Sequence, residues 1–373
     1  MHNTDLFTRA FVTPSRIKDF DLTQWELLIR QGRKALLLAK LYKKICQSDL
    51  DDKILPAAKC HLTSANTVAN RNRISVPMEV ERVRKLLASL GLDLVLLKGA
   101  AYATGDLPAA DGRTFTDIDI LVPEARLDEI EKTFKDDGWI GQHLNKYDQQ
   151  YYRQWMHEIP ALRHFRTGTL VDIHHTILPP TSKYHPDPKK LLESAIKVKP
   201  GVYTLCPVDM VIHSATHLFH EGEFEHGLRD LVDIHELLLH FGEHEPCFWD
   251  KLVPRAIDLD LITPLYYALH YCSIILDTKI PDRVLEQSQA GSPNPLMSRV
   301  MDFLFVRALR PNHPSCDLPF SSMARFMLYI RSHYLRMPLH LLIPHLVRKA
   351  WKKRFEENKP ETPMINKADQ KAN

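Results

Sequence analysis

Two aspartates, Asp117 and Asp119, alternate with Ile118 and Ile120 in a short apolar run. In a β-strand successive side chains point to opposite faces, so this spacing places both carboxylates on one face and both isoleucines in a core. Neighbouring carboxylates repel each other unless a cation lies between them. Hard divalent ions such as Mg²⁺ take oxygen ligands of this kind, so the pair indicates a site for metal-dependent phosphoryl or nucleotidyl transfer.

A glycine turn and a third acid flank this pair in the sequence. An apolar run ends at Lys98-Gly99 before a polar loop with Arg113, and Asp172 follows on a later strand, on the same face as His174. Lys98 and Arg113 are candidate contacts for a triphosphate, and arginine is the better bidentate partner for phosphate oxygens. The alternative for each cation is a salt bridge to the acidic strand, and the alternative for the acids is a solvated strand edge. His174 either orients a metal ligand or simply packs.

These residues resemble the motifs of the DNA polymerase β-like nucleotidyltransferase superfamily, and more closely those of the bacterial group called uncharacterised nucleotidyltransferases. The motifs of that group are a K-G-A turn, an R-x-x-x-D-I-D-x-L-V strand and a [VI]-D-[IL]-H strand. They match residues 98–100, 113–122 and 171–174. A downstream H…LR…D pattern matches His217, Leu228-Arg229 and Asp233.

The resemblance implies a nucleoside triphosphate, for example ATP, bound with two Mg²⁺ ions, or alternatively Mn²⁺. Carried over by position, Asp117, Asp119 and Asp172 are metal-binding and catalytic, and Asp172 also activates the acceptor hydroxyl. The expected nucleotide-binding residues are Lys98, Gly99, Ala100, Arg113 and His217.

One departure from the wider superfamily concerns the phosphate-binding turn. Many members carry a serine after the glycine, and its hydroxyl touches phosphate, whereas this chain has Gly99-Ala100. Phosphate binding is then expected to rest on backbone N–H groups, Lys98 or Arg113. A non-catalytic protein of the same fold, used for nucleotide sensing or scaffolding, is therefore an alternative function.

Three histidines provide a second alternative. His213, His217 and His220 share one face of an expected helix, which suggests a metal-dependent phosphohydrolase. The chain has neither an adjacent His-Asp pair nor an H-E-x-x-H motif. Structural roles, or a place in the nucleotide pocket, are therefore favoured for these imidazoles.

Hydrophobic periodicity predicts an α+β fold with a mixed-sheet nucleotidyltransferase core. The pattern indicates one amphipathic helix over residues 22–46, and another that begins at Pro77 and ends at Gly91. Strands are expected over residues 93–97 and 117–122, and a hairpin over 159–177.

The order of these patterns suggests four regions. They are an N-terminal helical region (1–75), an α/β core (76–180), a C-terminal helical domain (181–357) and a disordered tail (358–373). The chain of 373 residues is 44% hydrophobic and 25% charged, which is typical of a globular protein with room for several domains.

A reducing cytoplasm is the expected location. The six cysteines are far apart and include no C-x-x-C pair, which argues against a zinc ribbon or a disulfide framework. No signal peptide is recognisable, and no run reaches the roughly 20 apolar residues of a spanning helix.

The expected partners are the nucleoside triphosphate and an acceptor, which could be a small molecule, a sugar phosphate, a peptide, a protein side chain or RNA. A net charge of +3 is too small to indicate a nucleic-acid binder. Residues 325–354 form a basic segment interleaved with aromatic residues. A solvated helix face is its default interpretation, and contact with nucleic acid or an anionic membrane surface is the alternative.

Overall fold

The computed structural model describes residues 5–141, 156–220 and 222–337. The expected tail (358–373) and the end of the basic segment beyond residue 337 lie outside the described residues.

A seven-stranded mixed sheet carries the three acids, and its order is β3-β4-β5-β2-β1-β7-β6. β2 pairs in parallel with β5 and antiparallel with β1, and β1 pairs in parallel with β7. The predicted α+β class with a mixed sheet is confirmed. The strands are β1 (Leu94–Leu96), β2 (Asp117–Leu121), β3 (Trp139–Gly141), β4 (Leu162–His164), β5 (Leu170–His174), β6 (Ile196–Lys199) and β7 (Val202–Thr204).

The predicted hairpin is confirmed, because β4 and β5 pair antiparallel around Gly168, whose φ of 73° is left-handed. A second hairpin, β6–β7, was not expected. It turns at Gly201 with a φ of 69° and joins the sheet beside β1, so the sheet extends beyond residue 180.

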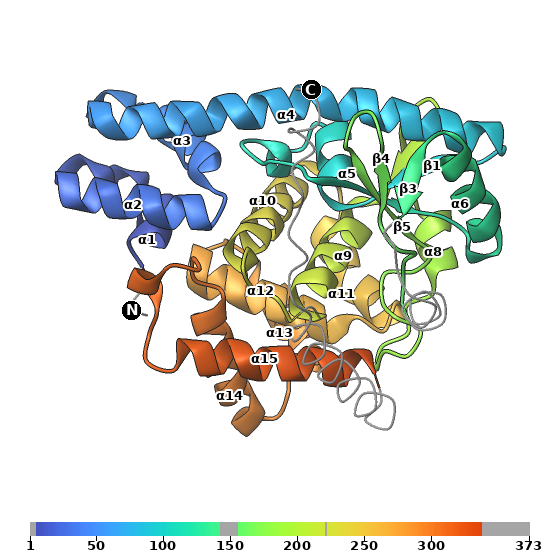
Figure 1. Ribbon diagram of the computed structural model, residues 1–373. Helices are drawn as coiled ribbons and strands as arrows, with labels where there is room; N and C mark the ends of the chain where they lie inside the picture. Colours follow the sequence, from blue (N-terminus) through green and yellow to red (C-terminus); the bar gives the residue numbers. More distant parts are fainter. Residues whose placement is uncertain (1–4, 142–155, 221, 338–373) are drawn as a thin grey trace, which may run out of the picture.

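Helix α4 (Pro56–Ser89) is 34 residues long and runs along one side of the molecule (Figure 1). The expectation of a helix that begins at Pro77 is wrong, because α4 continues through this proline. Its buried residues Ala58, Leu62 and Ala69 are followed by Val76 and Val80 at intervals that keep one face against the core. The expected region boundary at residue 75 therefore falls inside α4.

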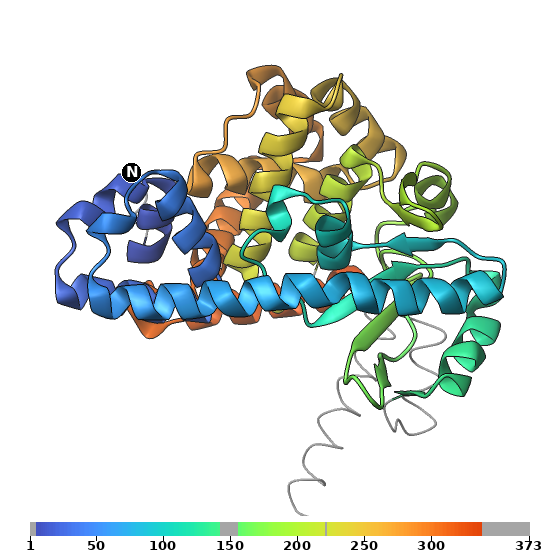
Figure 2. The same ribbon diagram turned by 90° about the horizontal axis from the view of Figure 1, so that it is seen from above.

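The N-terminal helices α1 (Leu6–Val12), α2 (Leu22–Lys34) and α3 (Leu38–Gln47) pack at one end of α4, whereas the sheet lies near the other end (Figure 2). The single helix predicted over residues 22–46 is wrong. Leu36 takes a left-handed φ of 58° and separates α2 from α3. This break lets Leu28 and Leu41, on two different helices, both enter the core.

From Pro207 to Arg336 the described chain is mainly helical, and α9 (Pro207–His220) and α10 (Gly227–His244) lie in the middle of the molecule (Figure 1). One hydrophobic cluster joins Leu28 of the N-terminal helices, Leu96 of the sheet and Leu237 of α10. The remaining helices are α5 (Lys98–Thr104), α6 (Leu127–Asp136), α8 (Pro188–Glu193), α9 (Pro207–His220), α10 (Gly227–His244), α11 (Phe248–Asp258), α12 (Ile262–Leu276), α13 (Asp282–Ser288), α14 (Pro295–Ala308) and α15 (Ser321–Arg336).

Within the described ranges, none of these helices combines the length and the apolar character that crossing a membrane requires.

Candidate active site

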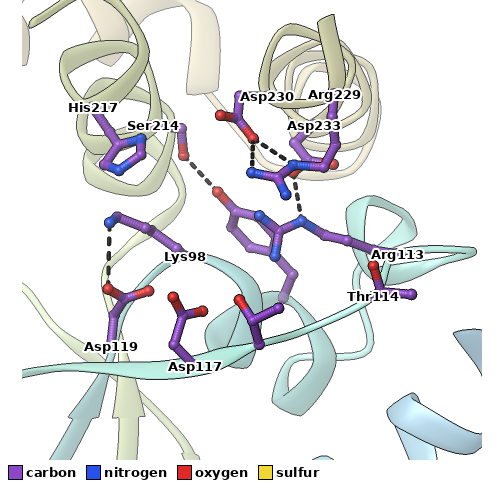
Figure 3. Close-up of a pocket in the computed structure, with 12 residues that line it drawn as sticks. Lys98, Arg113, Thr114, Asp117, Asp119, Ser214, His217, Arg229, Asp230 and Asp233 are labelled. Atoms are coloured by element: carbon purple, nitrogen blue, oxygen red, sulfur yellow. Dashed lines mark hydrogen bonds and ion pairs between the residues drawn. The ribbon is translucent and has the colours of Figure 1, made fainter. Parts of the chain in front are cut away.

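The three predicted acids lie on two neighbouring parallel strands. The register of β2 and β5 places Asp119 directly opposite Asp172, and Asp117 is two residues before Asp119. Because side chains alternate along a strand, all three carboxylates lie on one face of the sheet. Asp117 and Asp119 point from β2 toward a cavity beneath α9 and α10 (Figure 3).

This cavity has a volume of about 100 Å³ and is lined mainly by charged and polar side chains. It brings together Asp117, Asp119, Lys98, Arg113 and His217, five of the residues selected from the sequence; Asp172, Gly99 and Ala100 are not among its lining residues. The lining residues are Lys98, Tyr102, Arg113, Thr114, Thr116, Asp117, Asp119, Ser214, His217, Arg229, Asp230 and Asp233.

Asp119 is buried and lies between two basic groups. Its Oδ1 atom is 3.3 Å from Lys98 Nζ and accepts a hydrogen bond from His174 Nε2 at 3.0 Å. Burial disfavours the charged form of Asp119, but the charge of Lys98 and the hydrogen bond from His174 outweigh it and lower the pKa of this carboxyl well below its usual range. Asp119 is thus ionised and available as a ligand.

Asp172 shows the opposite behaviour. Burial, followed by repulsion from Asp119, Glu158 and Asp117, raises the pKa of Asp172 to about 7. Negative charge has therefore accumulated on this face of the sheet beyond what Lys98 and His174 offset. Oxygen donors with excess negative charge fit a hard divalent cation such as Mg²⁺.

Arg113 is held by α10. Its Nε donates a hydrogen bond of 2.7 Å to Asp233 Oδ2, and its guanidinium lies 5.7 Å and 5.5 Å from the ring centres of Tyr102 and Phe115. Burial opposes its charge, but Asp233 and then Asp230 raise the pKa of Arg113 above its ordinary value. The salt bridge to the acidic strand, considered as an alternative for both cations, is present for Lys98, whereas Arg113 pairs with α10 instead.

Lys40 of α3 also approaches the carboxylate of Asp233, through its other oxygen, and this lysine was not selected from the sequence. Its side chain is only 3% exposed, and its Nζ lies 3.8 Å from Asp233 Oδ1 and donates to the carbonyl oxygen of Ala109 at 3.1 Å. Lys40 also pairs with Glu236. A lysine among the buried apolar residues of an amphipathic helix was the available signal, since lysine is seldom buried without a partner.

The glycine turn is shaped by close packing. Lys98 takes a left-handed φ of 44°, which is strained for a residue with a side chain. A Cβ atom on Gly99 would collide with the Arg113 guanidinium and the Phe115 ring, so only glycine fits there. Ala100 is buried in the hydrophobic core at 2% exposure. Gly99 and Ala100 therefore do not line the cavity but pack against residues that do or against the core.

The histidines of α9 have separate environments. His217 lines the cavity, and His220 shares a hydrogen bond of 3.0 Å with Ser182 Oγ. Burial, assisted by the positive charge of Lys98, lowers the pKa of His213 well below its ordinary value. Among the described residues, ligand atoms close enough to share a metal ion are found in the group His157, Glu158 and His174, which is on the sheet. The geometry thus gives no support to a metal centre made by His213, His217 and His220.

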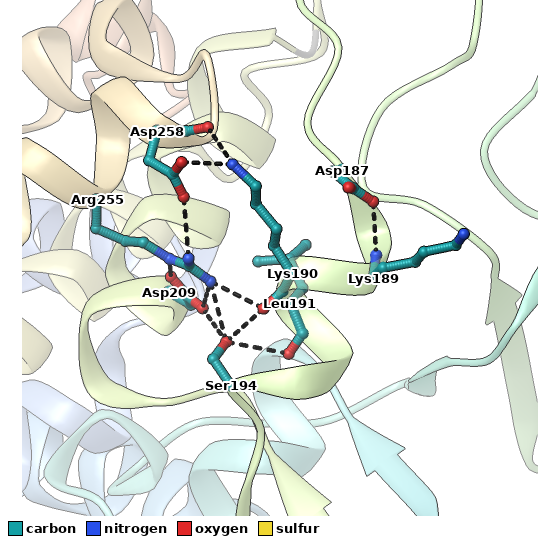
Figure 4. A network of polar contacts seen from close by, with 8 residues as sticks. All are labelled: Asp187, Lys189, Lys190, Leu191, Ser194, Asp209, Arg255 and Asp258. Carbon is teal, nitrogen blue, oxygen red and sulfur yellow. Dashed lines mark hydrogen bonds and ion pairs between the residues drawn. The ribbon is translucent and has the colours of Figure 1, made fainter.

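A different charged network fastens α9 to α11 (Figure 4). Arg255 donates to both carboxylate oxygens of Asp209, at 2.8 Å and 2.9 Å, and Ser194 Oγ donates to the same carboxylate at 2.6 Å. Asp258 accepts a further bond from Arg255 at 3.1 Å. Asp209 is completely buried and fully engaged, so its role is structural.

The basic C-terminal segment is described only as far as Met337. In this part, Arg325 pairs with Asp317 at 2.6 Å, and the half-buried Arg331 donates to the carbonyl oxygen of Phe219 at 2.8 Å. These two cations therefore have intramolecular partners.

Neither a curated protein nor a solved structure matches this chain. The family described as uncharacterised nucleotidyltransferase matches residues 21–277, which include α4, the whole sheet and helices α9 to α12. This range covers more than half of the chain and contains every residue that lines the cavity. The chain therefore belongs to the uncharacterised nucleotidyltransferase family.

Proposed function

We propose that this protein transfers a nucleoside monophosphate from a nucleoside triphosphate to a hydroxyl or phosphate group of an acceptor. The observation that carries the proposal is the register of β2 and β5, with Asp119 opposite Asp172 and Asp117 on the same face. Family membership supports the same reaction class. The acceptor is proposed to be a small molecule, a peptide or a protein.

The three carboxylates are proposed to hold two Mg²⁺ ions, with Mn²⁺ as an alternative. Such ions, when bound, stabilise the charge that develops on the attacking and leaving oxygens. Asp117 and Asp119 serve as ligands, and Asp172, whose pKa is raised to about 7, accepts the proton of the acceptor hydroxyl.

Lys98 and Arg113 are proposed to bind the triphosphate. Both line the cavity, and the planar guanidinium of Arg113 suits two phosphate oxygens at once. Asp233 and the phosphates then compete for Arg113, so nucleotide binding shifts this side chain from α10 toward the ligand. A volume of about 100 Å³ is below the roughly 300 Å³ of small ligand sites, so the phosphates enter the cavity while the base stays outside.

A reducing cytoplasm is the proposed location, and the six cysteines, all unpaired, support it.

The decisive experiment follows the α-phosphate. Purified protein is incubated with each of the four nucleoside triphosphates, labelled at the α-phosphate, together with Mg²⁺ and fractionated cell extract. Transfer of label to an extract component, with release of pyrophosphate, is expected for wild type and not for Asp119→Asn. Nucleotide binding without transfer in any fraction would instead identify the nucleotide-sensing alternative. Absence of nucleotide binding would contradict both functions.

A further inference from the structure

A cluster of two histidines and one glutamate lies beside β5, and one of its members, His174, contacts Asp119. Glu158 pairs with His174 through an isolated β-bridge, and His157 precedes Glu158. Glu158 Oε2 is 3.4 Å from His174 Nε2 and 4.0 Å from His157 Nε2. The three ligand atoms all lie within 4.8 Å of one another.

The backbone holds this cluster in place. The N–H of Ile159 donates to the carbonyl of Ile173 at 3.1 Å, and the N–H of His175 donates to the carbonyl of His157 at 3.0 Å. These bonds fasten residues 157–159 to β5 from both directions. The three side chains are therefore presented by sheet-bonded backbone, which favours a preformed site.

The spacing of these atoms suits a tetrahedral metal ion. Zinc lies about 2.0–2.1 Å from its nitrogen and oxygen ligands, so ligand atoms in a tetrahedral site are about 3.4 Å apart. The separation of Glu158 Oε2 from His174 Nε2 already has this value, and that from His157 Nε2 exceeds it by less than 1 Å. A small movement of the His157 side chain would bring it to the tetrahedral spacing, and the fourth position would remain open to water.

The donor set also selects the kind of ion. Two imidazoles and one carboxylate are the ligands of many zinc sites, whereas Mg²⁺ prefers oxygen ligands alone. The acids proposed to bind Mg²⁺ offer only oxygen. The two neighbouring groups of side chains therefore differ in the kind of ion that their donor atoms prefer.

We propose that His157, Glu158 and His174 bind Zn²⁺ or a similar divalent transition-metal ion. This site is separate from the proposed Mg²⁺ ligands, but His174 connects the two because its Nε2 also donates to Asp119. A metal ion on this nitrogen replaces the shared proton and breaks the bond to Asp119. Occupancy of the histidine site thus changes the hydrogen bonding of a catalytic-strand carboxylate. The rival account is a protonated His174 that bridges two carboxylates and binds no metal.

The test measures metal binding in the absence of nucleotide, so its result does not depend on the proposed transfer reaction. Untagged, chelator-treated full-length protein is titrated with Zn²⁺ by calorimetry and with Co²⁺ by visible absorption. One equivalent of metal is expected, with the Co²⁺ bands of a tetrahedral site that includes nitrogen ligands. Excess Mg²⁺ is expected to leave Zn²⁺ bound.

Two variants change the proposed zinc ligands while keeping all three proposed Mg²⁺ ligands. His157→Ala and Glu158→Gln are each expected to weaken Zn²⁺ binding by about tenfold or more. The matched control is the double variant His240→Ala/His244→Ala, which removes a stacked histidine pair on α10 that could bind zinc adventitiously. This control is expected to keep the tight site. Circular dichroism of the metal-free proteins is used to check that each variant is folded.

The proposal is overturned if wild type binds no stoichiometric Zn²⁺, if both ligand variants bind it as tightly as wild type, or if the double control abolishes binding. Should His157→Ala fail to fold, Glu158→Gln decides alone, because glutamine preserves the size of the side chain.

Discussion

Two charged networks each pair a buried aspartate with an arginine: Asp209 with Arg255, and Asp233 with Arg113. They differ in whether both carboxylate oxygens of the aspartate are hydrogen-bonded. In the network of Asp209 and Arg255, each carboxylate oxygen of the buried acid accepts well-formed hydrogen bonds (Figure 4). In the cavity network, Asp233 Oδ1 is buried without a hydrogen-bond partner, and Lys40 Nζ approaches it only to 3.8 Å. Figure 3 shows Asp233 beside Arg113 in this network. Asp172, near the same cavity, has a raised pKa.

The difference in hydrogen bonding suggests that one network stabilises the fold and the other binds a ligand. A satisfied buried ion pair holds two helices together and leaves no capacity for a ligand. An incompletely satisfied group retains a desolvation cost that a ligand or an ion can relieve. We therefore expect substitutions in the network of Asp209 to change the free energy of unfolding, and substitutions around the cavity to change nucleotide binding and transfer.

The largest expected effect concerns Asp119→Asn. Loss of this charge removes a proposed metal ligand, and the transfer rate is expected to fall by about 10³-fold or more, which corresponds to about 4 kcal/mol. Thermal unfolding is expected to change less than in Asp209→Asn, since Lys98 lines the cavity and can then be solvated, and the asparagine side chain can still accept from His174. The matched control is Asp93→Asn, an exposed acid just before β1. Retention of near wild-type transfer by Asp119→Asn would show that the acid is not catalytic.

A smaller effect, and one on stability alone, is expected for Asp209→Asn. The variant loses a fully buried charge that Arg255 contacts twice, and the free energy of unfolding is expected to fall by about 3 kcal/mol. Asp258→Asn, in the exposed part of the same network, is expected to lower the free energy of unfolding far less, because solvent screens an exposed ion pair. Denaturant unfolding measures both values. An equal loss in the two variants would contradict the distinction between buried and exposed pairs.

His235 on α10 is a second buried polar side chain with a hydrogen-bond partner, and it tests whether such groups act on the free energy of unfolding, as proposed for Asp209. It shares a hydrogen bond of 2.7 Å with Thr278, and burial, followed by the charges of Lys44 and Lys40, lowers the pKa of His235 to about 4. The unfolded chain takes up this proton below pH 6.5 while the folded protein does not, so the stabilisation is complete above pH 6.5 and is lost as the pH falls toward 4.

From about pH 7 to about pH 5, wild type should therefore lose about 2 kcal/mol more than the non-titrating variant His235→Asn. Denaturant unfolding of both proteins across this range provides the measurement. Parallel pH profiles would show that His235 is not the group responsible.

The smallest expected effect is on nucleotide binding and concerns Arg113, which lines the cavity. Arg113→Lys keeps the charge but loses the planar fork and the stacking against Tyr102 and Phe115. Binding of the Mg²⁺ complex of the nucleotide is expected to weaken by about tenfold in calorimetry, with unfolding almost unchanged. Arg84→Lys, in a half-buried pair with Glu81 outside the cavity lining, is the control and should bind normally. Equal affinities for wild type and Arg113→Lys would place the triphosphate elsewhere.

The sequence was most informative where a short local pattern determines the structure. Alternation predicted the strand of Asp117 and Asp119, and the dipeptide Thr167-Gly168 predicted the hairpin that brings Asp172 beside them. Both depend on residues only a few positions apart, and the resemblance to known motifs linked the two strands.

Contacts over long distances could not be predicted in this way. Lys40 meets Glu236 across 196 positions, and no local pattern encodes that meeting. The continuation of α4 through Pro77 was missed for a related reason, because packing against the core outweighs the local preference of proline to begin a helix.

Helix α4 carries a last consequence, which concerns the kinds of sequence change that this fold tolerates. Asn72 on α4 donates from Nδ2 to the carbonyl of Phe115 at 3.0 Å and accepts from the N–H of Phe115 at 2.5 Å, just before β2 begins. One inserted residue between Pro56 and Asn72 would turn this side chain by about 100° around the helix axis. Evolution along α4 should therefore proceed by substitution, while insertions and deletions collect in the surface loops.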